Sequence, residues 1–354
     1  MKEKNKLLYD TNEKPPVGKW IILAIQHVFA MFGATILVPI LVNKIANAEV
    51  LTIPVALVAS GIGTLIYILC TKGKSPVYLG SSFAYITPIA LAYERGGLSG
   101  FVTGIVGVGI VYILFALLIK IFGKNWVNKL LPPIVVGPMI MIIGLSLASN
   151  AVSQIGLTAT GFEWKSLVVA LVAFLVTALT AVGAKGFLKV IPFLIGITSG
   201  YIMSVILGIV DFQPVIDASF FEVPKFLLPI RDYTFSFVGL LTIAPIALVT
   251  IAEHIGDHMA LSTIIDKDLI KDPGLEKTLL GDGIATLTAG LIGGPANTTY
   301  GENTSVVGMT KVASVWVIGL AAVIAIGIGF LGKLSSQQFR TLYLVVYLYY
   351  YMVS

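Results

Sequence analysis

The sequence of 354 residues has few charged side chains, one cysteine and three histidines. Charged residues make up 12% of the chain, whereas soluble domains carry about 25%. The lone cysteine, Cys70, excludes an intramolecular disulfide framework. A hydrophobic share of 57% and a mean hydropathy of +0.95 instead indicate a polytopic membrane protein.

The basic residues do not gather in one patch, so the net charge of +5 does not indicate a nucleic-acid partner. The polar segment 1–19 has no cleavage site before the first apolar run. We therefore expect a cytoplasmic tail rather than a signal peptide, with the first span kept in the membrane.

Apolar runs of membrane-spanning character recur along the chain. They predict eleven spans, at residues 20–42, 50–70, 79–93, 98–119, 132–149, 166–183, 188–210, 236–262, 278–293, 301–310 and 312–332. The third and the tenth are too short to cross as plain helices, and small polar residues lie in or beside them. Placing the N-terminus inside puts most Lys and Arg in cytoplasmic segments, as the positive-inside rule requires.

The two halves of the chain repeat weakly. Gln26-His27 resembles Glu253-His254, and Ser82-Phe83 corresponds to Gly301-Glu302. The repeat unit has seven spans, and because seven is odd the second unit is inverted relative to the first. Inverted repeats with matched interrupted segments are typical of secondary transporters.

Ionisable side chains in the eighth span mark the candidate site. They are Glu253, His254, Asp257 and His258, and a second carboxylate, Glu302, follows in the interrupted run 293–303. An Asp near the centre of a membrane helix costs at least ~2.5 kcal/mol, so such groups persist where they line a cavity or pair. On a helix Glu253 and Asp257 share one face. Either these groups satisfy one another, or Glu253 faces a substrate cavity.

A planar ligand with alternating N–H and C=O groups suits this arrangement. Carboxylates accept from its N–H groups, and backbone N–H groups of the broken segments donate to its carbonyls. Gly301 lets a ligand approach the backbone, and Phe83 either stacks on the ligand or packs in the core. Carboxyl groups held close together in a low dielectric also suit proton coupling. Asp257, His258 and Glu253 are the candidates, and the sequence does not select among them.

Several stretches carry a resemblance to a known family. They are Gln26 to Ala34, Tyr78 to Ala84, Ala252 to His258, Asp272 to Leu275, and Asn297 to Lys311. In these stretches the chain resembles the nucleobase–ascorbate transporter family, and within it the bacterial uracil permeases, from about residue 15 to about 333. Asn297 to Lys311 is similar to the family's signature region, and a glutamate at position 302 is similar to the uracil branch.

The resemblance implies a proton-coupled nucleobase importer, not an enzyme, with an all-α fold of fourteen helices in two inverted seven-helix repeats and a short strand in spans three and ten. The expected organisation is a tail at 1–19, a core domain at 20–122 and 236–332, and half of a gate domain at 123–235. Residues 333–354 are unlike the family, so we expect a truncated or frameshifted reading frame that lacks the second half of the gate.

The resemblance also implies roles for single residues. Glu253 and Glu302 would hold uracil, and Ser82, Phe83, Tyr300 and Gly301 would line its site. Gln26, His27, His254 and Asn303 would support the site, while Asp257 or His258 would be tied to proton coupling. The expected partners are uracil, H+, membrane lipid and a second copy of the chain, with no cofactor or metal.

Alternatives remain open at this point. A purine permease of the same family, an anion transporter and a non-transporting remnant fit the same spans. An anion carrier would need cationic or helix-terminus groups at its site. A membrane metalloenzyme is disfavoured because the order Glu-His-x-x-Asp-His differs from the His-Glu-x-x-His of zinc peptidases.

Overall fold

The computed structural model describes residues 7–124, 126–127, 157–158, 161–184, 192–210, 219–227 and 234–332, with six single positions between them. Most described residues are helical. The chain divides into two compact units, Met1–Met139 with Val223–Phe330, and Ile140–Glu222 with Leu331–Ser354. Most of the predicted span 132–149 and all of the tail 333–354 lie outside the described residues.

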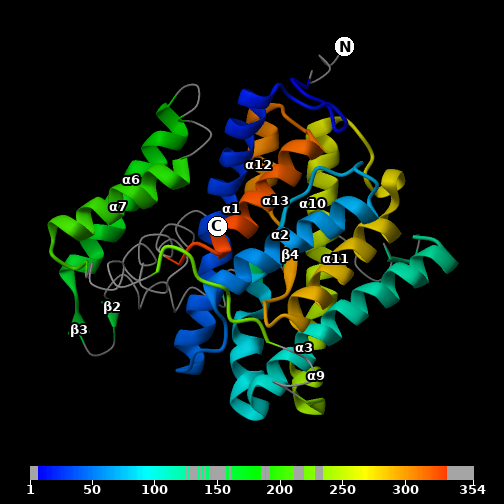
Figure 1. Cartoon of the computed structure of the whole chain (residues 1–354), viewed down its shortest axis with the longest axis horizontal. Coiled ribbons are helices and arrows are strands. Elements are labelled where there is room, and N and C mark those ends of the chain that lie inside the picture. The colour runs from blue at the N-terminus through cyan, green and yellow to red at the C-terminus, as the bar shows by residue number, and fades with distance from the viewer. Residues whose placement is uncertain are drawn as a thin grey trace. The chain divides into compact units, whose positions relative to one another are not determined.

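The first unit contains most of the described elements (Figure 1). In chain order they are α1 (Val17–Ala46), α2 (Ile53–Cys70), β1 (Leu79–Ser81), the 3-10 turn η1 (Phe83–Tyr85), α3 (Ile86–Phe122), α9 (Phe237–Ile243), the 3-10 turn η3 (Ala244–Ile246), α10 (Ala247–Ile265), the π turn η4 (Ile270–Gly274), α11 (Leu275–Leu291), β4 (Asn297–Thr299), α12 (Gly301–Thr310) and α13 (Val315–Gly329). The second unit contains β2 (Leu157–Thr158), β3 (Gly161–Phe162), α6 (Trp164–Gly183) and α7 (Pro192–Ile206).

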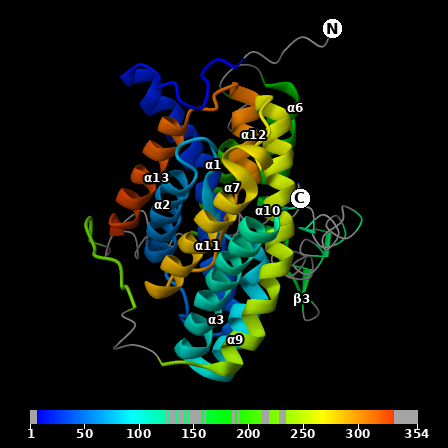
Figure 2. The same ribbon diagram turned by 90° about the vertical axis from the view of Figure 1, so that its right-hand side faces the viewer.

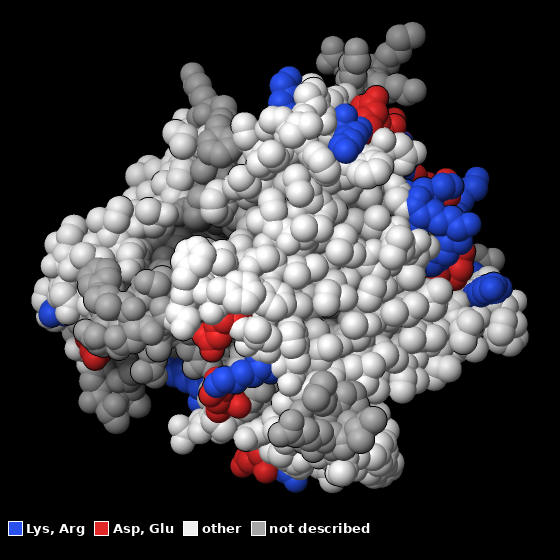
Figure 3. All heavy atoms as spheres, viewed as in Figure 1, with Lys and Arg blue, Asp and Glu red and all other residues white. Residues whose placement is uncertain are grey.

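Five described helical segments are long and apolar enough to cross a membrane. They are Val17–Ala46, Ile53–Cys70, Phe83–Phe122, Trp164–Gly183 and Phe237–Ile265. On α3 the side chains of Leu114, Leu117 and Ile121 are exposed at helical spacing, as a lipid-facing stripe would be. Most of the surface in Figure 3 is likewise uncharged, and its charges gather in patches.

The segment that combines the predicted spans 79–93 and 98–119 reverses at Gly97. This residue has φ 59° and ψ −153°, which is not helical. A side chain at Gly100 would lie only 2.2 Å from the carbonyl oxygen of Ala92, whereas a continuous helix would hold these positions about 12 Å apart. The two runs are therefore separate helices folded back on each other, as the two predicted spans require.

Two short strands far apart in sequence pair inside the first unit. β1 and β4 run antiparallel, with Leu79 opposite Thr299 and Ser81 opposite Asn297. Each strand leads directly into a helix, β1 through η1 into α3 and β4 into α12. The strand predicted for span three is present as β1, whereas the strand predicted for span ten lies just before that span, as β4, and the span itself is the helix α12. The pair β2–β3 was not predicted, because two-residue strands have no periodicity to detect.

Side chains from neighbouring helices hold this strand pair. Ser60 Oγ on α2 donates to the carbonyl of Leu79 over 2.7 Å, and the Leu79 amide donates to Thr64 Oγ1 over 2.9 Å. On the other strand, the Asn297 amide donates to Thr286 Oγ1 over 3.2 Å. α2 packs against α11 and α13 (Figure 2), so these contacts fix the broken elements within the helix bundle.

Residues 7–16, which we call the N-terminal strap, pack onto the loop between α12 and α13. The Leu8 amide donates to the Lys311 carbonyl over 2.7 Å, and the amides of Ala313 and Val315 donate to carbonyls of the strap. Lys267, at the end of α10, donates to Asp10 over 2.5 Å. Residues 7–16 of the predicted tail 1–19 are therefore ordered, and α1 begins at Val17.

A second ion pair joins the loop 71–78 to η4. Lys74 Nζ, in the loop 71–78 between α2 and β1, lies 2.7 and 2.9 Å from the carboxylate oxygens of Asp272 in η4. The hydrogen bond from Lys74 lowers the pKa of Asp272 below its usual value. Figure 3 shows the charges gathered around η4 and the end of α10.

Candidate functional site

Two carboxylates from separate elements lie within electrostatic range of each other in the first unit. Glu253 is half-buried on α10, and Glu302 is half-buried in the first turn of α12. Glu253 interacts electrostatically with Glu302, and also with Asp257 and Asp282. Glu253 and Glu302 are far apart in the sequence, but β4 places α12 beside α10.

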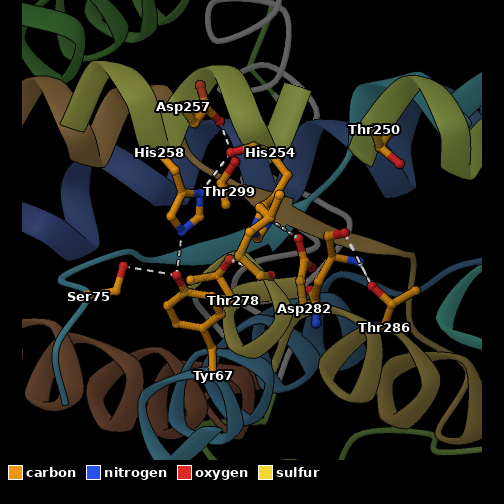
Figure 4. A network of polar contacts seen from close by, with 12 residues as sticks. Tyr67, Ser75, Thr250, His254, Asp257, His258, Thr278, Asp282, Thr286 and Thr299 are labelled. Atoms are coloured by element: carbon orange, nitrogen blue, oxygen red, sulfur yellow. Dashed lines mark hydrogen bonds and ion pairs between the residues drawn. The ribbon is translucent and has the colours of Figure 1, made fainter. Parts of the chain in front are cut away.

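Asp257 faces the strand pair. Thr299 Oγ1 on β4 donates a hydrogen bond to Asp257 Oδ2, and the two side chains point toward each other in Figure 4. This contact joins α10 to β4, so the position of the strand depends on the carboxylate one helical turn after Glu253.

His254 forms a fully buried pair with Asp282 of α11. Its Nδ1 lies 2.8 Å from Asp282 Oδ2, and neither side chain is exposed. Among the described residues no three His, Cys, Asp or Glu side chains gather as metal ligands do. The pair therefore links α10 to α11 without the ligand set that a metal ion needs.

His258 turns away from Asp257 and toward α2 (Figure 4). Its Nδ1 donates to the His254 carbonyl over 2.7 Å, and its Nε2 lies 2.5 Å from Tyr67 Oη. Tyr67 Oη in turn lies 2.9 Å from Ser75 Oγ. The rings of His254 and His258 stack with their centres 4.1 Å apart. The two neighbouring proton-coupling candidates thus contact different elements.

The residues predicted to line the site lie where the strands become helices. Ser82 is buried and Phe83 half-buried just after β1, while Tyr300 is buried and Gly301 exposed just after β4. Tyr300 Oη donates to the Ser81 carbonyl over 3.1 Å and lies 3.1 Å from Thr35 Oγ1. Its hydroxyl is therefore engaged by the protein.

Glycine at position 80 makes room for the tyrosine ring. A Cβ there would lie 2.3 Å from Tyr300 Cζ, which no side chain tolerates. The ring of Tyr300 consequently lies directly against the β1 backbone and supports the strand pair from one side.

The predicted supporting residues of α1 contact α12. Asn303 Nδ2 donates to the His27 carbonyl over 3.1 Å and lies 3.0 Å from His27 Nδ1. Gln26 is buried, and its Oε1 has no hydrogen-bond partner among the described residues. Because Asn303 follows Glu302, its contacts with α1 fix the first turn of α12.

Sequence analysis did not assign a role to Asp282, Thr299, Tyr67 or Ser75. Asp282 carried a detectable signal, since it is a carboxylate within an apolar span. Tyr67 lies on α2, Ser75 in the loop after it and Thr299 on β4, and a buried hydroxyl side chain in a membrane protein is common as a packing residue. Only the tertiary contacts distinguish these three.

Known proteins of one family are similar to this chain over most of its length. Residues 18–339 match the Permease family. The chain is 47% identical over 340 residues to the uracil permease of Bacillus subtilis (strain 168), covering 94% of this chain and 77% of that protein. It is 41% identical over 331 residues to the uracil permease of Escherichia coli (strain K12), covering 92% of this chain and 74% of that protein.

Two solved structures share the fold at low identity. The transmembrane domain of the cyanobacterium bicarbonate transporter BicA matches with a TM-score of 0.67 and 16% identity, over 96% of this chain and 89% of that one. SLC26A9 matches with a TM-score of 0.62 and 14% identity, over 95% of this chain and 58% of that one. The helices therefore have the arrangement of a membrane transporter.

Proposed function

Since the chain belongs to the Permease family, we propose that it carries uracil across the cell membrane together with protons. The uracil assignment is carried by identities of 41–48% to three uracil permeases over more than nine-tenths of the chain. Identity of this order over most of both chains favours a common substrate. The anion transporter alternative has only a likeness of fold in its support.

The geometry of Glu253 and Glu302 suits uracil. This base has two N–H groups and two carbonyls in one plane, and two neighbouring carboxylates accept from the N–H groups. The first N–H groups of α12 have no partner within the helix and suit a carbonyl. In this proposal Phe83 stacks on the ring, and Ser82, Tyr300 and Gly301 line the site, the last two through their backbone.

The carboxylates also supply the means for proton coupling. Glu253, Asp257 and Glu302 bring like charges into a low-dielectric interior, and taking up a proton removes one charge and its desolvation cost. A proton on Asp257 or His258 lowers the cost of keeping Glu253 and Glu302 ionised as acceptors for uracil, so uracil and that proton favour each other's binding. Asp257, His258 and Glu253 are the proposed proton carriers.

Transport then follows from alternating access. We assign residues 20–122 and 236–332 to a core domain that holds the site, and residues 123–235 to a gate, arranged as inverted repeats in a possible homodimer. The paired broken elements β1 and β4 support this assignment, since such elements mark the substrate site in transporters with inverted repeats. The lysines of the strap side, including Lys74, Lys267 and Lys311, would face the cytoplasm with the N-terminus.

Competition binding tests the substrate. Purified protein is expected to bind radiolabelled uracil, and unlabelled uracil is expected to displace it while xanthine, adenine and ascorbate do not. Displacement by xanthine at equal concentration would favour the purine permease instead. No uracil binding at all would favour a non-transporting protein.

Uptake into proteoliposomes tests proton coupling. Uracil entry is expected to acidify the lumen and to rise as the external pH falls. A protonophore is expected to abolish accumulation. Uptake that ignores both pH and protonophore would contradict the coupling but leave the substrate assignment intact.

A further inference from the structure

A chain of hydrogen bonds runs from a surface loop into the interior of the first unit. Ser75 is fully buried in the loop 71–78, directly after Lys74, whose side chain is 47% exposed. From Ser75 Oγ the chain passes over 2.9 Å to Tyr67 Oη and over 2.5 Å to His258 Nε2 (Figure 4). We call Ser75, Tyr67 and His258 the hydroxyl relay.

The partners of His258 fix the direction of these bonds. Its Nδ1 contacts a carbonyl, which only accepts, so Nδ1 carries a hydrogen. In the structure Tyr67 Oη donates to Ser75 Oγ, which leaves Tyr67 Oη as the acceptor for an N–H at His258 Nε2. These bond directions are those of the ring that carries a proton on Nε2. When Nε2 loses that proton, it accepts from Tyr67, and the bond between Tyr67 and Ser75 reverses.

Apolar side chains surround the middle of the relay. Tyr67 lies in a buried cluster whose members come from the loop after α2, from β1, from α10 and the turn that follows it, and from α12. They include Val77, Leu79, Leu261, Ile265, Leu269 and Val307. These described side chains offer water no hydrogen bonds, so a proton that crosses the cluster would pass through the relay.

The titratable groups near the relay are few. His254 stacks on His258 from one turn earlier on α10, Asp282 of α11 and Cys70 of α2 interact electrostatically with Tyr67, and Asp257 is turned toward Thr299. Asp282 pairs with His254, whose ring stacks on that of His258. The carboxylate of Asp282 therefore offsets a positive charge on the stacked rings.

We propose that Ser75 and Tyr67 form the route by which His258 releases the coupled proton to the side of the membrane that holds the loop 71–78. The proposal rests on the proton-coupled uptake above. In the release step His258 Nε2 gives its proton to Tyr67 Oη, and Tyr67 gives its own hydroxyl proton to Ser75 Oγ. Ser75, which is buried directly after the exposed Lys74, gives its own to water that enters at the loop 71–78. His258 returns to neutral, and both hydroxyls are restored.

Tyr67→Phe removes the relay hydroxyl and keeps the ring in its apolar cluster. Uracil accumulation driven by a pH gradient is expected to fall by about tenfold or more, as for loss of a proton-transfer group. Exchange of internal for external uracil at equal pH needs no net proton release, so it is expected to keep the wild-type rate. Tyr201→Phe removes a tyrosine hydroxyl elsewhere and is expected to leave both activities unchanged.

If Tyr67→Phe folds poorly, two variants of Ser75 test the hydroxyl relay instead. Ser75→Ala is expected to lose gradient-driven accumulation but not exchange, whereas Ser75→Thr keeps a hydroxyl and is expected to keep both. Undiminished accumulation in Tyr67→Phe and Ser75→Ala would overturn the relay. Equal loss of exchange and accumulation would also overturn it, because that indicates a purely structural role.

Proton movement by the wild-type protein distinguishes a failure of the relay from a failure of proton-coupled uptake. If wild-type uptake moves no protons, the coupling itself is wrong, and the relay with it. If wild-type uptake moves protons and the variants move the same number per uracil, only the relay is wrong.

Discussion

At the scale of single residues, the buried polar side chains are held in place by contacts from distant parts of the chain. His254 pairs with Asp282, Asp257 with Thr299, and Asn303 with His27. Each of these bonds joins two elements, so each side chain has one position rather than several. A ligand that meets them does not have to order them first.

Glu302→Gln is expected to weaken uracil binding by about a hundredfold, because the amide replaces one accepting oxygen with a donor that faces an N–H group. Equilibrium binding of radiolabelled uracil measures this change. Glu94→Gln, at an exposed position of α3, is the matched control and is expected to bind as the wild type does. Equal affinity in both variants would remove Glu302 from the site.

At the scale of elements, sequence analysis succeeded where local pattern determines structure. Apolar runs predicted α1, α2 and α6, and the short polar spans predicted β1 and β4. It did not find the N-terminal strap or the contact of Tyr67 with His258, because these depend on partners roughly 200 or more residues away. Helical spacing shows which side chains share a face, but it does not show what that face contacts.

Thr64→Val is expected to weaken the strand pair. The hydroxyl of Thr64 accepts from the Leu79 amide and donates to its carbonyl, and valine has the same shape but can do neither. An unsatisfied buried amide costs about 1–3 kcal/mol, so the detergent-solubilised protein should melt at a lower temperature. Thr263→Val, exposed on α10, is the control. Unchanged melting of Thr64→Val would show that the strand does not depend on this residue.

The ion pair of Asp10 and Lys267 makes the strap's stability depend on pH in a defined direction. Partial burial raises the pKa of Asp10, but hydrogen bonds from Lys267 and Thr11 and the charge of Lys267 together bring it below its usual 3.8. A lowered pKa stabilises the strap above pH 3.8, and this contribution is lost as the pH falls through the folded value.

Asp10→Asn is therefore expected to speed hydrogen exchange at the amides of Leu8, Ala313 and Val315 at neutral pH. The effect is expected to stay below about 1 kcal/mol, because the pair is partly exposed. After correction for intrinsic rates, wild-type protection should not change between pH 7 and pH 5. Lys271→Met removes a nearby lysine as a control, and equal exchange in both variants would contradict the role of Asp10.

At the scale of the whole molecule, the charged loops define one end of the first unit. The strap, the loop 71–78, η4 and the turn after α12 contact one another there. These segments carry several of the lysines that were expected on the cytoplasmic side, such as Lys74, Lys271 and Lys311. The positive-inside rule expects such lysines on one side of the membrane, and their proximity in space agrees with that expectation.

Cysteine labelling tests this orientation, since Cys70 is the sole native cysteine. In a Cys70→Ser background, Lys74→Cys is expected to react with a membrane-impermeant maleimide only after the cells are opened. Arg95→Cys, at the exposed turn before Gly97, is expected to react in intact cells. The reverse pattern would invert the topology.

The pairing of β1 with β4 also constrains how the protein is made. Thr299 is synthesised about 220 residues after Leu79, its partner, which at ribosomal speed is a delay of about 10 to 40 s. During that interval the backbone N–H and C=O groups of β1 lack the partners that β4 will supply, and lipid cannot hydrogen-bond to them. We therefore expect insertion of this chain to need cellular machinery that shelters the incomplete bundle until β4 has been synthesised.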